Sequence, residues 1–207
     1  MRDVIGGVVS LLAPRRCAGC DETLEVSGVF CGACATLIEH TSNPCAVFEY
    51  GGPVADAIQR FKYDGRSELG AALGSVMATD AHAWAGKVDA VVPVPLHWRR
   101  RRSRGYDQAA LLSKPVAKSL AVPLMLRGLR RVRNTPSQVE LPHRERQQNM
   151  TGAFAPWRLG GLRRLLLIDD VRTTGATLRA ASEGLRAGGA SEVHTFVLAT
   201  RVLVQSA

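Results

Sequence analysis

A run of four apolar residues at 165–168, followed at once by two acidic residues, is the most informative pattern along the chain. A short continuous apolar run is typical of a strand that is buried on both faces, as the strands of parallel sheets are. After a polar turn, apolar and small residues recur with the spacing of one helix face, at Leu178, Ala181, Ser182 and Leu185. The pattern ends at Gly188 and Gly189, which favour a helix stop. It therefore predicts a strand, a turn and a helix, as in an open α/β sheet.

Similar patterns along the rest of the chain predict further helices and strands. We expect helices at 3–13, 54–61, 69–85 and 108–120, and strands at 88–94, 124–126 and 192–201. Residues 23–26 and 29–30 are expected to form a small hairpin. Pro115 lies inside the helix expected at 108–120, where a proline removes a backbone hydrogen bond and kinks the helix.

The turn after the apolar run combines two carboxylates, three threonines and a glycine. Its residues are Asp169, Asp170, Val171, Arg172, Thr173, Thr174, Gly175, Ala176 and Thr177. The N–H groups and partial positive charge of a helix N-terminus suit a phosphate, and Gly175 lets the backbone approach it. Asp169 and Asp170 lie where open α/β sheets bind ligands, and ionised carboxylates accept hydrogen bonds from sugar hydroxyls. The turn thus predicts a ribose 5-phosphate site; the alternative is a surface turn in which Thr174 caps the helix.

The chain is strongly basic, with a formal net charge of +9 from 27 basic and 18 acidic residues. Four of the basic residues are lysines, so most of the positive charge is carried by guanidinium groups, which suit bidentate phosphate binding. A G+C-rich genome, which favours arginine codons, explains scattered arginines equally well. Lys62 and Arg66 are candidates to contact a phosphate, with solvated side chains as the alternative.

A cluster of arginines follows the strand expected at 88–94. The five are Arg99, Arg100, Arg101, Arg102 and Arg104. We expect a loop at 99–104 that faces a pyrophosphate, in which Arg104 and Gly105 are the best candidates because they adjoin the next helix. Asp107 is placed to cap that helix. The alternatives are a solvated basic loop and a non-specific nucleic-acid patch.

Residues 130–150 form a long, basic and mostly polar stretch. Such a stretch cannot be a buried element, and it is predicted to be a lid that closes over the phosphate site. The alternative is a surface excursion of the chain.

Four cysteines form two C-x-x-C knuckles near the start of the chain, at Cys17, Cys20, Cys31 and Cys34. Four thiolates make a closed tetrahedral zinc site with a structural role. The alternatives are two disulfides or free thiols, of which disulfides are disfavoured in the cytoplasm. Cys45 is left over and is expected to pack in an apolar site. We therefore expect a zinc module at 1–45 and a second domain at 46–207.

No apolar run reaches the ~18 residues that a membrane span requires. The apolar segment at 4–13 lacks the small-residue cleavage site of a signal peptide. We therefore expect the chain in the cytoplasm.

The run of two acids followed by T-T-G-x-T resembles the phosphoribosyl-pyrophosphate motif of type I phosphoribosyltransferases. It is not a P-loop, because no Gly-Lys-Ser/Thr follows, and G-x-G-x-x-G is absent. Together with the cysteines, further runs make the whole chain resemble the ComF family. These runs are 61–63, 93–96, 104–108, 135–138 with Arg144, Arg146 and Asn149, and 152–154. Two positions depart from the family pattern: Asp107 stands where Asn is more frequent, and Pro115 interrupts the following helix.

The resemblance implies a type I phosphoribosyltransferase-like fold, with a central, mostly parallel sheet flanked by helices and a small four-cysteine zinc module. It also implies an enzyme that binds phosphoribosyl pyrophosphate with Mg²⁺ through residues 169–177, Arg104 and Gly105, with Asp169 and Asp170 as the catalytic residues. No residue is a clear general base. One alternative is an accessory protein of DNA uptake that binds single-stranded DNA through its basic face and finger. Another is an interaction protein that bridges partners through the finger.

Overall fold

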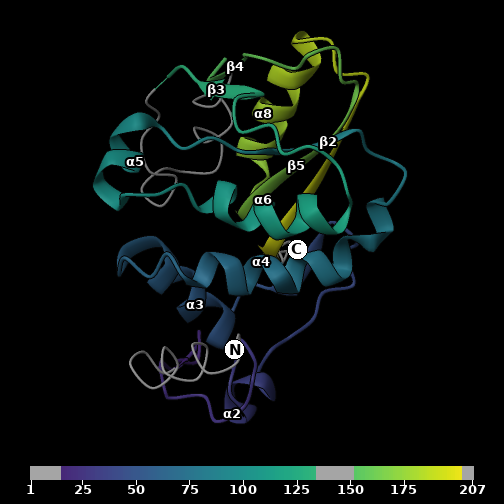
Figure 1. Cartoon of the computed structure of the whole chain (residues 1–207). Helices are drawn as coiled ribbons and strands as arrows, with labels where there is room; N and C mark the ends of the chain where they lie inside the picture. Colours follow the sequence, from purple (N-terminus) through teal and green to yellow (C-terminus); the bar gives the residue numbers. More distant parts are fainter. Residues whose placement is uncertain (1–14, 134–151, 202–207) are drawn as a thin grey trace, which may run out of the picture.

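The computed structural model describes residues 15–133 and 152–201. The helix expected at 3–13 and most of the lid expected at 130–150 lie outside these residues. The described chain is an α/β fold with a central parallel sheet and helices on both of its faces (Figure 1). None of its helices is long and apolar enough to cross a membrane.

The central sheet contains four parallel strands in the order β1-β6-β5-β2. Their bounds are β1 Ala46–Glu49, β2 Ala90–Pro93, β5 Arg164–Arg172 and β6 Glu192–Thr200. Ile168 of β5 pairs with Pro93 of β2 and with Phe196 of β6, so the apolar run at 165–168 lies in the middle of the sheet. All four residues of the run are fully buried, which confirms a strand that is covered on both faces.

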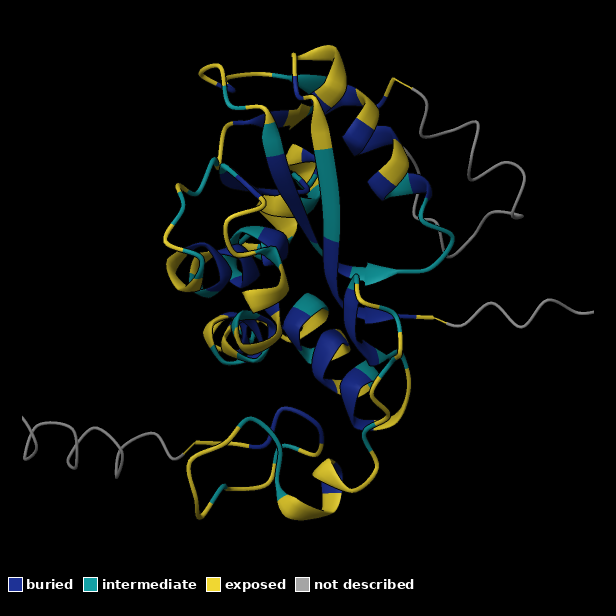
Figure 2. Ribbon diagram, turned by 90° about the vertical axis from the view of Figure 1, so that its right-hand side faces the viewer, coloured by how far each residue is buried: buried dark blue, intermediate teal, exposed yellow. Residues whose placement is uncertain are grey.

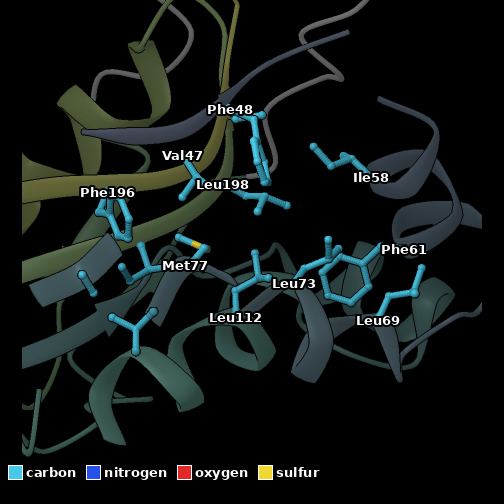
Figure 3. Close-up of a cluster of buried hydrophobic side chains, with 14 of the residues drawn as sticks. Val47, Phe48, Ile58, Phe61, Leu69, Leu73, Met77, Leu112, Phe196 and Leu198 are labelled. Atoms are coloured by element: carbon cyan, nitrogen blue, oxygen red, sulfur yellow. The ribbon is translucent and has the colours of Figure 1, made fainter. Parts of the chain in front are cut away.

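Helices α3 (Gly52–Tyr63), α4 (Leu69–Asp80) and α6 (Gln108–Ser119) pack on one side of the sheet. Their apolar side chains meet those of β6, and Figure 3 shows Leu73, Met77 and Leu112 in the same core as Phe196 and Leu198. A Cβ on Gly74 of α4 would lie 2.9 Å from the Leu112 carbonyl oxygen and 3.0 Å from Cγ of Pro115. The two helices therefore approach as closely as they do because position 74 has no side chain. Helix α6 continues through Pro115.

Helix α8 (Ala176–Ala187) and a two-stranded antiparallel sheet cover the other face. The small sheet pairs β3 (Leu129–Arg131) with β4 (Phe154–Pro156). The face of α8 predicted from the spacing is buried, at Leu178, Ala181, Ser182 and Leu185. Figure 2 shows that the central strands are buried, whereas the helices are exposed on their outer sides.

The cysteine-rich part of the chain lies beside α3, at the end of the molecule opposite α8 (Figure 1). It contains one short helix, α2 (Gly32–Ala35). Its residue Ala18 is fully buried in the same core cluster as Val54 and Phe61 of α3. The module therefore shares a core with the α/β part of the chain, and a domain boundary between residues 45 and 46 stays a prediction.

Several expected elements differ from the structure. The hairpin at 23–26 and 29–30 does not form; Thr23 instead bridges Arg16, because the chain turns back within the first knuckle. The arginines at 99–104 lie on a helix, α5 (Trp98–Arg104), rather than in a loop. Strand 124–126 is reduced to a single bridge from Leu124 to Val91 of β2.

Other differences concern element ends and three strands that were not predicted, namely β1, β3 and β4. Helix α4 ends at Asp80 and is followed by a 3₁₀ turn, η1 (Ala81–Trp84), instead of continuing to residue 85. The start of the predicted polar stretch belongs to β3, where Arg130 and Arg131 pair with Ala155 and Phe154. Strand β1 was not predicted, because four residues are too few to show a period.

The contact between α4 and α6 predicts a stability difference between two valine substitutions on α4. Gly74→Val should lower the free energy of unfolding by about 1–3 kcal/mol, because the new side chain has no space between the helices. Ala71→Val, on the exposed side of the same helix, should change it by less than about 1 kcal/mol. Urea unfolding followed by circular dichroism measures both values, and equal effects would contradict the close approach at Gly74.

Candidate functional site

The two carboxylates lie within β5, which continues past them to Arg172, so they belong to the strand rather than to the turn expected from the sequence. The alternation of side chains along a strand sends the two acids in different directions. Asp170 is buried, and its Oδ2 lies 2.9 Å from Nζ of Lys62 at the end of α3. Asp169 is half-buried; its Oδ1 accepts a hydrogen bond from the Asp170 backbone N–H at 2.9 Å. Arg131 of β3 lies near enough to Asp169 to interact with it electrostatically. The acid pair therefore does not point into solvent, and it is framed by cations from α3 and β3.

The surroundings of the acid pair change its proton affinity. Burial, followed by the neighbouring Asp170 carboxylate, raises the pKa of Asp169 to about 8, although the Lys62 ammonium acts in the opposite direction. Burial lowers the pKa of Lys62, but the Asp170 carboxylate outweighs it, so the net shift is upward. Burial also raises the pKa of Asp107. A carboxyl group that changes protonation near neutral pH is a candidate to exchange protons with a ligand.

The threonine–glycine turn lies open beside the end of the sheet. Gly175 has a positive φ of 73°, which a glycine adopts at no steric cost, and α8 begins at the next residue. The Thr174 hydroxyl accepts a hydrogen bond from the Ala176 N–H at 3.3 Å, but the N-cap residue of α8 is Gly175, so Thr174 is not the cap that the alternative interpretation expected. The turn borders a pocket of about 490 Å³. It is not closed off by packed side chains.

Several residues that line the pocket were not predicted from the sequence. They are Thr41, Ser42, Asn43, Glu49, Arg179, Thr200 and Arg201, which join Arg172, Thr173, Thr174 and Gly175 of the turn. Register explains part of this set, since Glu49 of β1, Thr200 of β6 and Arg172 of β5 are paired positions. Only the pairing of strands distant in sequence brings them to one edge, and no motif marks them.

Three guanidinium groups make the pocket basic. Arg172 donates from Nε to the Thr200 hydroxyl at 3.2 Å, and Arg179 donates from Nη1 to the Thr174 carbonyl at 2.9 Å. Arg201 lies over the ring of Tyr50, 5.2 Å from its centroid. Each guanidinium carries five N–H donors, so these contacts leave donors for an anion. Glu49 opposes them with one carboxylate; its buried Oε2 has no hydrogen-bond partner among the described residues.

The basic helix α5 contributes to the site through its last residue. Arg104 donates from Nη1 to Oε1 of Gln108 at 3.1 Å and lies over the ring of Tyr63, next to Lys62. Gly105 ends α5 with a positive φ of 79°. Asp107 caps α6 as predicted, accepting from the Ala110 N–H at 3.1 Å. The structure thus brings Arg104 towards Lys62 and the acid pair, whereas Gly105 serves as a helix terminator.

Lys62 near the end of α3 and Arg66 after it, the two residues expected to contact a phosphate, have different partners. Lys62 joins the acid pair, whereas Arg66 pairs with Asp21 and with Glu68. Arg66 thus contacts the cysteine-rich part rather than the turn.

The four knuckle cysteines converge. Their sulfur atoms all lie within 4.8 Å of one another, so the cluster could hold a metal ion. The structure has no disulfide among the five cysteines, and Cys45 does not belong to the cluster. The Cys31 N–H donates to the Cys17 sulfur at 3.2 Å. Burial raises the pKa of Cys17, but hydrogen bonds from the knuckle backbone outweigh it, and the result is about 6. Such ready ionisation fits a thiolate metal ligand at Cys17, whereas burial and the neighbouring thiols raise the pKa of Cys34 in the same cluster.

Comparisons with known proteins give relatives along most of the chain. Competence protein F of Haemophilus influenzae is 30% identical over 211 residues, which cover 88% of this chain and 89% of that protein. DNA utilization protein YhgH of Escherichia coli K12 is 28% identical over 201 residues, with 88% of each chain covered. Competence protein ComFC of Bacillus subtilis is 29% identical over 155 residues, covering 74% of this chain and 62% of its own.

The chain was also compared with family models and with solved structures. No family model matches the chain. Among solved structures, a glutamine phosphoribosylpyrophosphate amidotransferase from B. subtilis, complexed with ADP and GMP, is 23% identical with a TM-score of 0.47; the match covers 67% of this chain and 30% of that one. A likeness this distant carries no argument about function. The similarity to competence protein F, in contrast, extends over nearly all of both chains at 30% identity, and the chain therefore belongs to the competence protein F (ComF) family.

Proposed function

We propose that the chain binds phosphoribosyl pyrophosphate at the carboxyl edge of β5 and transfers its phosphoribosyl group to an acceptor. The observation that carries this proposal is the order of residues at one strand end, where the acid pair of β5 is followed, after Val171 and Arg172, by an open basic turn at the N-terminus of α8. A sugar phosphate carries groups that match these two parts of the site, with hydroxyls for the acid pair on one side and a phosphate for the turn on the other.

The phosphate is assigned to the turn. Residues 173–177 offer backbone N–H groups and hydroxyls at a helix N-terminus, which favours an anion. Val171 and Arg172 lead into the turn, and Arg172 and Arg179 add positive charge on the pocket side. Gly175 has no side chain that would obstruct the phosphate.

The ribose is assigned to the acid pair. Carboxylates accept hydrogen bonds from vicinal hydroxyls, and Asp170 is held in place by its ion pair with Lys62. With a pKa of about 8, Asp169 can also give up or take a proton near neutral pH. The two acids therefore carry the catalytic role assigned to them from the sequence.

The leaving pyrophosphate is assigned to the side of Arg104 and Gly105. In the reaction, the bond from the anomeric carbon to the pyrophosphate oxygen breaks, and a bond to the acceptor forms. Mg²⁺ bound with the ligand would neutralise charge on the leaving group. Arg104, supported by Gln108 and Tyr63, would add a second positive charge there. As in the sequence, no side chain stands out as a general base.

The cysteine cluster is proposed to hold a structural zinc ion. Four thiolates leave no open position on the metal, so the ion would fasten the module rather than act on a substrate. The relatives' names refer to competence and to DNA utilization, and we propose that the chain acts in the same process, in the cytoplasm.

A second candidate function is binding of single-stranded DNA, and one surface feature favours it. Trp157 is 49% exposed, and two guanidinium groups lie near its ring, with Arg127 at 5.5 Å and Arg158 at 5.9 Å from the ring centroid. An exposed aromatic ring near guanidinium groups suits a base that stacks next to its phosphates.

Phosphoribosyl pyrophosphate should bind in the presence of Mg²⁺, and the double variant Asp169→Asn/Asp170→Asn should weaken this binding about 10–100-fold, because charged hydrogen-bond acceptors are lost. Isothermal titration calorimetry measures the affinities. Asp56→Asn, an exposed acid on α3, is the matched control and should bind like the wild type. An absence of heat at millimolar ligand, or an unchanged affinity in the double variant, would refute the proposed site.

Chelation of the metal should lower the thermal midpoint. Removing an ion present at 100 times its Kd withdraws about 2.7 kcal/mol, or roughly 5–11 °C for a chain of this size. Scanning calorimetry with and without chelator, together with native mass spectrometry, tests this. Cys20→Ser should lose the ion, whereas Cys45→Ser should keep it, since Cys45 lies outside the cluster. A Cys45 variant that loses the ion, or a wild type indifferent to chelator, contradicts the assignment.

Single-stranded DNA should bind with a steep dependence on salt, because phosphate contacts release counterions. Trp157→Ala should weaken binding of a labelled oligothymidylate by about 1–3 kcal/mol through lost stacking, as measured by fluorescence anisotropy. The Asp169→Asn/Asp170→Asn protein serves as the control and should bind DNA normally. A flat salt response, or a Trp157 variant that binds like the wild type, argues against this surface.

A further inference from the structure

The end of helix α3 contacts two separate parts of the molecule. Arg60 and Lys62 are two residues apart, and residues at this spacing point in different directions from a helix. Arg60 reaches the cysteine-rich part, whereas Lys62 reaches the acid pair on β5. One turn of helix therefore connects the cysteine cluster with the proposed ribose site.

The first knuckle is seated directly on α3. Arg60 donates from Nη1 to the carbonyl oxygen of Ala18 at 3.2 Å and also to that of Gly19. Gly19 is pressed against the start of the same helix, since a Cβ there would lie 2.9 Å from Cβ of Pro53 and 3.0 Å from the Cys34 sulfur. Both carbonyls belong to the knuckle from Cys17 to Cys20, so the fold of the knuckle determines where Arg60 finds its acceptors.

Further contacts hold the chain immediately before Lys62 and after it. Tyr106 donates its hydroxyl to the Phe61 carbonyl at 2.6 Å. Arg66 pairs with Asp21, the residue that follows the first knuckle. The cysteine-rich part therefore contacts this segment both before and after Lys62, and it limits how far Lys62 can move from Asp170.

Lys62 stands among several charges that face the acid pair. Arg104 at the end of α5 and Arg131 of β3 are the other cations, and Asp107 at the start of α6 is a further carboxylate. Lys62 forms an ion pair with Asp170, with 2.9 Å between Nζ and Oδ2. Without Lys62, less positive charge would offset the three carboxylates, which would repel one another and an anionic ligand more strongly.

We propose that Lys62 is a positioning residue that keeps Asp170 ionised and orients the acid pair for the ligand, and that the cysteine-rich part holds Lys62 there through α3. This inference rests on the proposed function in assigning the ribose hydroxyls to the acid pair. The charge effect itself is a property of the unliganded protein, so it is measurable without any ligand.

The first experiment replaces the charge of Lys62. In Lys62→Met, carboxyl ¹³C NMR should show the acid pair titrating about 1–3 pH units higher than in the wild type, because the opposing cation is gone. The affinity for phosphoribosyl pyrophosphate with Mg²⁺ should then reach its maximum at correspondingly higher pH. Lys62→Arg, which keeps the charge, should restore most of the wild-type profile. Lys87→Met, an exposed lysine on a distant turn, is the matched control.

The second experiment removes the hydrogen bonds between α3 and the first knuckle and leaves Asp169 and Asp170 unchanged. Arg60→Met removes the donor to the Ala18 and Gly19 carbonyls; it should raise the amide exchange rate at 60–66 and shift the acid titration upward by less than Lys62→Met does. Arg60→Lys keeps a single cationic donor and serves as the milder variant if Arg60→Met folds poorly. If Lys62→Met folds poorly, Lys62→Gln is used in its place.

The outcomes separate the two proposals. A wild type that does not bind phosphoribosyl pyrophosphate, with an upward titration shift in Lys62→Met, refutes the proposed function and supports the role of Lys62. A wild type that binds, with unchanged titration and pH profile in Lys62→Met, overturns the positioning role and leaves the proposed function standing. An Arg60→Met protein with wild-type exchange and titration overturns the link to the cysteine-rich part.

Discussion

The ion pair between Lys62 and Asp170 is the contact on which the candidate site depends. A carboxylate at the end of a buried strand is costly to ionise unless a cation lies beside it, and here the cation comes from a helix outside the sheet. Because that helix also seats the first cysteine knuckle, the pair connects three parts of the molecule: the sheet, α3 and the cysteine module. Loss of either partner would leave the other partly buried and unpaired.

The parallel sheet explains why the candidate residues meet at one edge. Strands that are buried on both faces leave only their ends for chemistry, and in a parallel sheet all carboxyl ends lie together. The acids of β5, Arg172 of the same strand, Thr200 of β6 and Glu49 of β1 therefore share an edge. Close packing of α4 against α6 at Gly74 keeps one face of this sheet covered and leaves its edge open.

Charge is divided unevenly over this edge. The acid pair lies among carboxylates and is balanced by Lys62, Arg104 and Arg131, whereas the pocket beyond the turn has three arginines and one glutamate. A ligand with hydroxyls at one end and phosphate at the other matches this division. The net charge of +9 of the chain adds a general attraction for anions, which by itself does not distinguish a sugar phosphate from a nucleic acid.

Features that depend on neighbouring residues could be predicted from the amino-acid order. The buried run at 165–168, the face of α8, the cap at Asp107 and the two cysteine knuckles are all encoded within a few positions, since hydrophobic period and turn chemistry are local. Tertiary structure alone decided that Lys62 pairs with Asp170, that Glu49 and Arg201 line the pocket, and that the arginines after β2 form a helix. The pocket and ion-pair contacts join segments that lie far apart in the sequence, and the helix at the arginines depends on the elements that pack beside it. The free energy that selects these arrangements comes from burial of the whole core.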